Sequence, residues 1–137
     1  MRGKKKYRSK KDLIRSLMMK QLKNVKFGKD WVSLEYDGKK IKNKIKIVKH
    51  EWGVGDWDRK KNIVFIDDDL KRKRDVQSVA LHECIEKYVA QKYKLNVDDE
   101  AHHIAEAVEK RYYRILDGSW KVHQKKVEKV WIKEGMK

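Results

Sequence analysis

Two long helical segments separated by a short break constrain this fold more than any other feature of the sequence. The pattern from about Leu70 to Tyr93 predicts one helix, which residues 94–97 interrupt. Acidic residues at 98–100 favour the start of a second helix, because the helix dipole stabilises negative charge in a first turn. That helix is expected to stop near Leu116, at Asp117-Gly118. So short a break predicts that the second helix returns antiparallel to the first and packs along it.

The residues before these helices predict a small sheet. Residues 31–36 alternate in polarity and end at Asp37-Gly38, a dipeptide typical of a tight hairpin turn. Residues 41–48 form the expected return strand, and residues 62–67 form a short apolar strand just before the first long helix. The order predicts an α+β fold, with a small antiparallel or mixed sheet packed on two to three helices.

The chain of 137 residues fits one domain. Residues 1–8 are expected to be a flexible basic arm, and residues 9–137 a single domain. Ser9 is the expected N-cap of a first helix, and Ser119 that of a last one. We expect no membrane span, because no apolar run approaches 18 residues, and no signal peptide.

Charge is unevenly distributed. The formal net charge is +16, and residues 1–61 hold 21 Lys/Arg against 7 Asp/Glu, whereas residues 62–117 hold 10 against 12. Such an excess favours an anionic partner, and the alternative is a surface that is basic only for solubility. Because Lys far outnumbers Arg, any nucleic-acid binding is expected to be salt-sensitive and independent of sequence.

The motif that carries chemistry lies in the middle of the first long helix. His82 and Glu86 are four residues apart, so their side chains project from one face, and Glu83 is adjacent to that face. A helix with this spacing can hold a divalent metal with two ligands and aim a carboxylate at the water beside it. The alternative is a charged helix whose acids are solvated.

A third ligand is expected from His102 or His103 on the second helix. His102 flanks the apolar stripe of that helix and can point toward the first helix, whereas His103 is expected to be more exposed. The predicted donors are therefore His82, Glu86 and His102, and two His with one Glu form a known catalytic zinc set. Both histidines could instead lie on the surface as ordinary polar residues.

With these residues in view, the sequence resembles the minimal zincin-like metallopeptidases. The resemblance covers roughly residues 62–116: a short strand and acidic turn, NIVFIDDDL, lead into the helix of His82-Glu83. It implies a metal-dependent hydrolase, in which His82 is a ligand and Glu83 the general base, acting on a protein or peptide substrate. The departure is Glu86, which stands where the family has a second His. Zinc is the expected cofactor, with manganese or iron as alternatives.

Two further roles are expected around this motif. His50 and the basic run at 71–74 are candidates for stabilising an oxyanion, and the run could equally be a solvated turn or bind phosphate. The strand at 63–66 is expected to be the edge on which an extended peptide docks.

A second hypothesis is a basic nucleic-acid-binding protein, with a structural or degenerate metal site and contacts through the basic N-terminal region. The five tryptophans are expected in the core or a lid rather than as platforms for bases. Cys84 is the single cysteine and is expected to be a core residue, so a reducing cytoplasm is the expected compartment.

Overall fold

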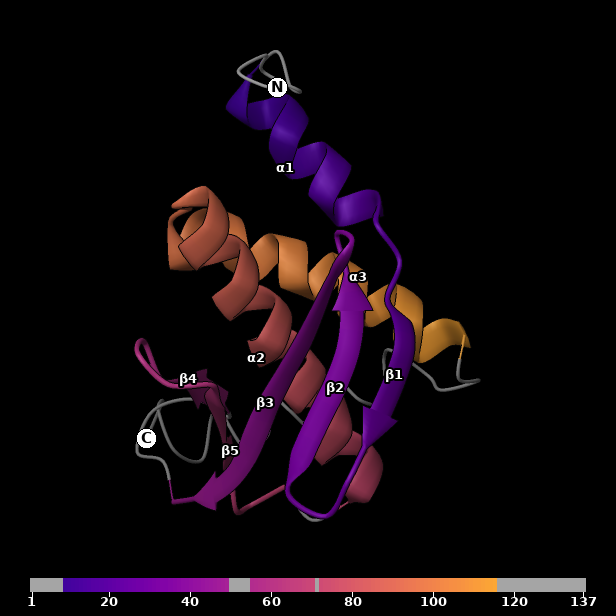
Figure 1. The fold of residues 1–137 in the computed structure, drawn as a ribbon, viewed down its shortest axis with the longest axis vertical. Coiled ribbons are helices and arrows are strands. Elements are labelled where there is room, and N and C mark those ends of the chain that lie inside the picture. The colour runs from indigo at the N-terminus through magenta and orange to yellow at the C-terminus, as the bar shows by residue number, and fades with distance from the viewer. Residues whose placement is uncertain (1–8, 50–54, 71, 116–137) are drawn as a thin grey trace.

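The computed structural model describes residues 9–49, 55–70 and 72–115, and it confirms the predicted α+β class (Figure 1). Its elements, in chain order, are α1 (Lys10–Met19), β1 (Lys23–Phe27), β2 (Trp31–Tyr36), β3 (Lys39–Val48), β4 (Gly55–Trp57), β5 (Ile63–Asp67), α2 (Lys73–Tyr93), the π-helical turn η1 (Val97–Ala101) and α3 (His102–Ile115). Ser9 caps α1 as expected, since its Oγ accepts a hydrogen bond from the backbone N–H of Asp12.

The strands form one mixed sheet in the order β1-β2-β3-β5-β4. The predicted hairpin is confirmed: β2 pairs with β3, and the turn residues Asp37 and Gly38 have φ values of 56° and 72°. Positive φ at both positions is what a two-residue turn of this hand requires, and Gly adopts it without strain. Strand β3 then pairs in parallel with β5, while the other pairs are antiparallel.

Two short strands were not predicted. β1 joins the outer side of β2, and β4 joins the side of β5 that does not face β3. Because β4 pairs with β5, the expectation that the strand at 63–66 is the sheet edge is wrong. That edge is formed by β4, and β5 is an interior strand.

Helix α2 packs on one face of the sheet and forms the core with it. It begins at Lys73 rather than near Leu70 and ends at Tyr93, because the left-handed backbone of Lys94 stops the helix. The buried apolar side chains come from inward-facing strand positions and from α2, and they include Val32, Leu34, Val64, Ile66, Leu81, Cys84 and Ile85. Cys84 is therefore a core residue, as predicted.

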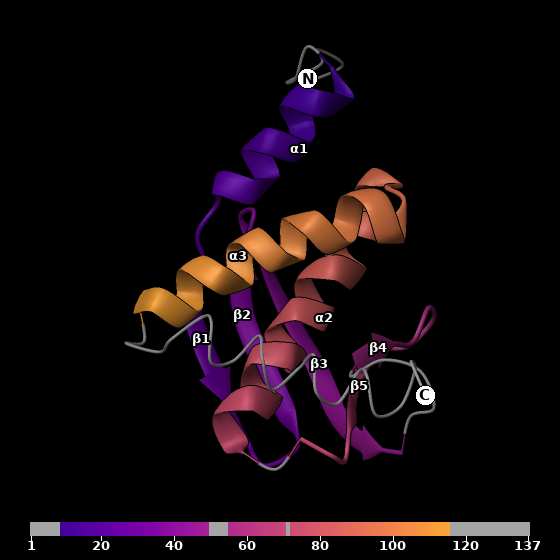
Figure 2. The ribbon, with the colours of Figure 1, turned by 180° about the vertical axis from the view of Figure 1, so that it is seen from behind.

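Helix α3 returns along α2, as the short break predicts (Figure 2). The fully buried residues of its apolar stripe are Ile104, Ala105 and Val108, and Ala101 of η1 continues the stripe. Both helices lie on the same side of the sheet, behind it in Figure 1 and in front of it in Figure 2. Helix α1 packs against α3, and Arg111 donates a hydrogen bond to the carbonyl of Met19.

Several predicted features lie outside the described residues. These are the basic arm at 1–8, His50, Lys71 and the helix expected from Ser119. Within the described ranges, none of the helices combines the length and the apolar character that crossing a bilayer requires.

Candidate metal centre

His82 and Glu86 lie one turn apart on the face of α2 that is turned toward α3. Both are largely buried, at 9% and 7% exposure, although each carries a group that can be charged. Burial of such groups costs several kcal/mol unless they find partners. The partners come from α3 and from β4.

The ligand atoms of the three predicted metal ligands converge. His82 Nε2 lies 3.3 Å from Glu86 Oε2 and 3.1 Å from His102 Nδ1, and His102 Nδ1 lies 3.4 Å from Glu86 Oε2. The structure therefore brings His82, Glu86 and His102 together from two helices as a nearly equilateral triangle. We call this the ligand triangle.

His102 reaches the triangle because of the turn that precedes α3. The Asn96 side chain accepts a hydrogen bond from the backbone N–H of Asp99, and the Glu100 carboxylate accepts one from the backbone N–H of Asn96. The two side chains thus cap the start of the helical segment reciprocally. The backbone N–H of His102 closes the π-helical turn on Val97. His102 keeps 42% of its side chain exposed, so solvent reaches the triangle from this side. His103 is exposed and lies outside the triangle.

Glu109 holds the far side of the His82 ring. Its Oε1 lies 3.1 Å from His82 Nδ1, and its side chain is buried. In the neutral ring, a carboxylate at this distance favours the tautomer with the proton on Nδ1, which directs the lone pair of Nε2 at the triangle. Burial by itself lowers the pKa of His82, but the hydrogen bonds to Glu109 and Glu86 outweigh it and raise that pKa well above its ordinary value.

Sequence reasoning missed Glu109. It follows His102 by seven residues, which is two helical turns, so both side chains share one face of α3. That spacing is the pattern from which Glu109 could have been found.

Trp57 of β4 orients Glu86. Its indole Nε1–H donates to Glu86 Oε1 over 2.9 Å, which leaves Oε2 in the ligand triangle. Burial raises the pKa of Glu86, but hydrogen bonds to His102, His82 and Trp57 outweigh it and lower that pKa to about 2. Glu86 is therefore a carboxylate at neutral pH, as a metal ligand must be. The sequence pattern predicted tryptophans in the core or a lid, and it did not predict that Trp57 would donate a hydrogen bond to a metal-ligand candidate.

Glu83 is buried beside the triangle, at 6% exposure. Burial is the main cause that raises its pKa to about 8, and the charge of His82 partly opposes the rise. Its carboxylate lies against the backbone of β4, since a β-carbon on Gly55 would be 2.8 Å from Glu83 Oε2. A carboxyl group with this pKa can both accept and release a proton near neutral pH.

The triangle fits a tetrahedral metal ion. An ion bound through bonds of about 2.0–2.1 Å holds its ligand atoms roughly 3.3 Å apart, which is close to the three observed separations. Two imidazole nitrogens and one carboxylate oxygen are also a donor set that suits zinc, and a face without a protein ligand is left toward solvent.

Of the residues expected to stabilise an oxyanion, the described part of the chain places Arg74 against Tyr113 rather than at the triangle. His50 and Lys71 lie outside the described residues, and the Arg74 guanidinium lies 4.8 Å from the centre of the Tyr113 ring. Arg74 is thus held on α3 by a cation–π contact.

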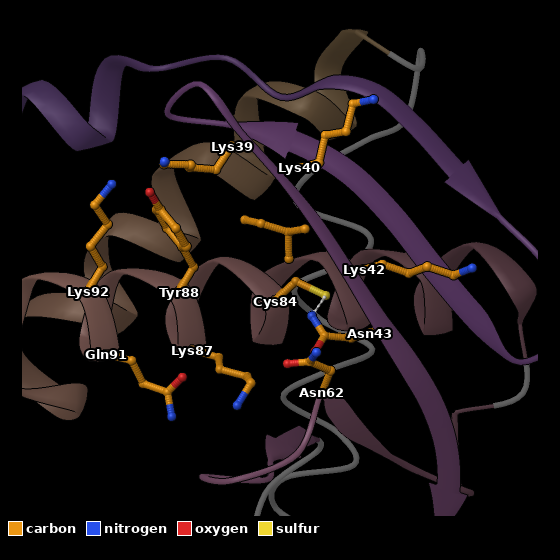
Figure 3. A pocket seen from close by; sticks show the side chains of 11 residues that line it. Lys39, Lys40, Lys42, Asn43, Asn62, Cys84, Lys87, Tyr88, Gln91 and Lys92 are labelled. Atoms are coloured by element: carbon orange, nitrogen blue, oxygen red, sulfur yellow. Dashed lines mark hydrogen bonds between the residues drawn. The ribbon is translucent and has the colours of Figure 1, made fainter.

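A pocket lies on the other side of α2 from the ligand triangle (Figure 3). It has a volume of about 490 Å³ and contains none of the three candidate ligands. Its lining comes from β3, Asn62 and α2, and it includes five lysines and no acidic residue: Lys39, Lys40, Ile41, Lys42, Asn43, Asn62, Cys84, Lys87, Tyr88, Gln91 and Lys92. The pocket and the triangle are therefore separate features of α2.

Comparison of the chain with known protein families, with curated proteins and with solved structures gives no match.

Proposed function

We propose that this protein is a metal-dependent hydrolase, and specifically a peptidase. The observation that carries the proposal is the convergence of His82 Nε2, Glu86 Oε2 and His102 Nδ1 beside the buried carboxyl group of Glu83. Structural metal sites usually have four protein ligands, whereas catalytic sites keep a position open. Three ligands that face solvent at His102 support the catalytic kind.

Zinc is the metal that we propose for the triangle, with manganese or iron as alternatives. When bound, such an ion acts as a Lewis acid that acidifies water and polarises a substrate carbonyl. On the protein side, Glu109 fixes the ring of His82 and Trp57 fixes the carboxylate of Glu86, so the ligands are oriented before an ion arrives.

Glu83 is the proposed general base. Its carboxylate takes a proton from the attacking water and afterwards gives that proton to the leaving amine. Its pKa of about 8, raised mainly by burial, supports this double role, because proton transfer is most effective when the pKa of the group is near the working pH.

The substrate that we propose is an extended peptide that docks on β4. This strand is an edge of the sheet, so its outer backbone groups have no partner among the described strands. Gly55 brings that edge against Glu83, and Trp57 connects it to Glu86. A peptide paired with β4 by backbone hydrogen bonds would therefore lie beside the proposed base. The cytoplasm is the proposed compartment, in keeping with a lone, buried cysteine.

The experiment that tests the proposal measures metal content and hydrolysis together. Protein purified without chelators is analysed for transition metals by mass spectrometry, and cleavage of an unstructured protein such as casein is followed. We expect about one metal ion per chain, lost in His82→Ala and retained in Glu83→Gln, which abolishes cleavage. The absence of bound metal, or cleavage that survives Glu83→Gln, would rule the proposal out.

A further inference from the structure

One face of the sheet bears no described helix. Helix α2 packs on the opposite face and α3 lies on that same side, so the side chains that point away from them form a separate surface (Figures 1 and 2). We call it the outer sheet face. It lies across the sheet from the ligand triangle, and nothing in the proposed hydrolysis uses it.

Strand β3 supplies a row of charge to the outer sheet face. Its side chains alternate, so the positions at Ile41, Asn43 and Ile45 face α2, while the lysines between them face outward. Figure 3 shows Asn43 pointing at Cys84 of α2 and Lys42 pointing the other way. The row consists of four exposed side chains: Lys40, Lys42, Lys44 and Lys46.

The register of the strands extends this row across the sheet. Residues paired across neighbouring strands share a face. Lys23 therefore lies beside Glu35, which lies between it and Lys40, and Ser33 lies in the same way between Lys26 and Lys42. The face thus carries six lysines, and the acidic strand residues that the pairing places on it among those described are Glu35, Asp56 and the fully buried Asp67. Glu35 is engaged, since its Oε2 accepts a hydrogen bond from the side chain of Asn24.

Apolar side chains are interleaved with these lysines. Lys44 lies between Trp31 and Ile63, and Lys46 lies beside Phe65. All three apolar side chains are only partly buried. The Trp31 ring lies against Gly28, where a β-carbon would approach it to 2.0 Å, and the ammonium of Lys42 lies 4.7 Å from its centre. The ring is therefore fixed in place and holds Lys42 by a cation–π contact.

We infer that the outer sheet face binds single-stranded nucleic acid, with the four β3 lysines on phosphates and Phe65 against a base. Alternate residues of a strand are about 6.8 Å apart, which lets successive lysines reach successive phosphates of an extended strand. A flat face can contact bases only where they are unpaired, because a duplex presents phosphates and groove edges. The interleaved apolar groups are therefore what favours a single strand over a duplex.

The main test compares nucleic-acid binding by a variant that lacks the charges of the row with binding by a variant that lacks four positive charges elsewhere. Binding of a fluorescent 15-nucleotide oligothymidine is measured by anisotropy over a range of salt concentrations. One variant carries Lys→Gln at 40, 42, 44 and 46, and the control carries Lys→Gln at the exposed positions 11, 60, 61 and 94. Both variants lose four positive charges, so they differ only in where the charge is lost.

We expect the row variant to bind at least about tenfold more weakly, with its salt slope reduced by about 3, because each lost phosphate contact removes about 0.7 from that slope. The control variant should keep the slope of the unmodified protein. Equal losses in both variants, or no binding by the unmodified protein at low salt, would overturn the inference.

A second measurement tests whether the outer sheet face prefers a single strand to other anionic ligands. Phe65→Thr keeps a residue that favours strands and removes the ring, so it should weaken oligothymidine binding several-fold and leave duplex binding unchanged. Equally tight binding of a duplex, or preferential binding of vesicles of anionic lipid, would also overturn the inference. Lysine labelling of the unmodified protein, with and without oligothymidine, should show protection of the row and none at Lys60 or Lys61.

Discussion

Gly55 and Glu83 are in such close contact that a single added carbon would displace one of them. A β-carbon at Gly55 would lie 2.8 Å from Glu83 Oε2 and also 2.8 Å from Val79 Cγ1. The glycine thus allows the edge strand β4 to pass directly over the proposed base.

Gly55→Ala is expected to lower kcat/KM for peptide hydrolysis by about 10- to 100-fold while metal content stays unchanged, because a shift of the Glu83 carboxylate by a fraction of an ångström misplaces the base. Gly38→Ala is the matched control, since Gly38 has a φ of 72° and open space around it, so that substitution costs stability without reaching the site. Equal activity in the two variants would show that this contact has no role in catalysis.

His102→Ala is expected to weaken metal affinity by at least about 100-fold, because it removes a ligand rather than a supporting group. His103→Ala should change it less than about threefold, since His103 is exposed outside the ligand triangle. Competition with a chromophoric chelator measures both. If the two substitutions had the same effect, His102 would be an ordinary surface histidine.

Glu109→Gln is expected to weaken metal affinity by about 10- to 100-fold without abolishing it, because Gln still accepts a hydrogen bond from His82 Nδ1 but lacks the charge that favours that tautomer. Glu106→Gln, on the same helix and outside the triangle, is the control. Unchanged affinity in Glu109→Gln would mean that Glu109 only fills space beside His82.

The stability of the metal-free protein should depend on pH through Glu83. Its pKa rises from an ordinary 4.5 to about 8 on folding, mainly because of burial, so the folded state binds this proton more tightly than the unfolded state. Its contribution is therefore fully present below about pH 4.5 and is lost as the pH rises toward 8. Glu83→Gln cannot ionise, so its stability relative to the unmodified protein should rise by about 3 kcal/mol between pH 5 and pH 8.

Urea unfolding of the chelator-treated proteins at the two pH values measures this difference. A stability gap that is the same at pH 5 and pH 8 would contradict the assignment of the raised pKa to Glu83.

The sequence predicted those parts of the fold that depend on local pattern. The Asp37-Gly38 dipeptide is one that two-residue hairpin turns strongly prefer, and the i, i+4 spacing of His82 and Glu86 places both on one face wherever the helix forms. The choice of His102 over His103 also followed from the apolar stripe of α3, and the structure brings His102, not His103, to the triangle.

The parts that were missed depend on contacts between distant residues. Strand β4 has only three residues, and its pairing with β5 gives it structure that its own sequence does not indicate. The edge of the sheet was therefore assigned to the wrong strand. The supporting contacts of Trp57 to Glu86 and of Glu109 to His82 join residues 29 and 27 positions apart. The spacing of His102 and Glu109 places both on one face of α3, but it does not show that His82 of another helix is the partner of Glu109.

The alternation of β3 also has a consequence for folding. If the strand slipped by one residue against β2, the four lysines of the row would turn inward against α2, and Ile41 and Ile45 would turn to solvent. Several unpaired ammonium groups in an apolar interior would cost far more than the few kcal/mol by which a domain is stable. The lysines of the row thus disfavour any slip of β3 by an odd number of residues, because each such slip would bury them.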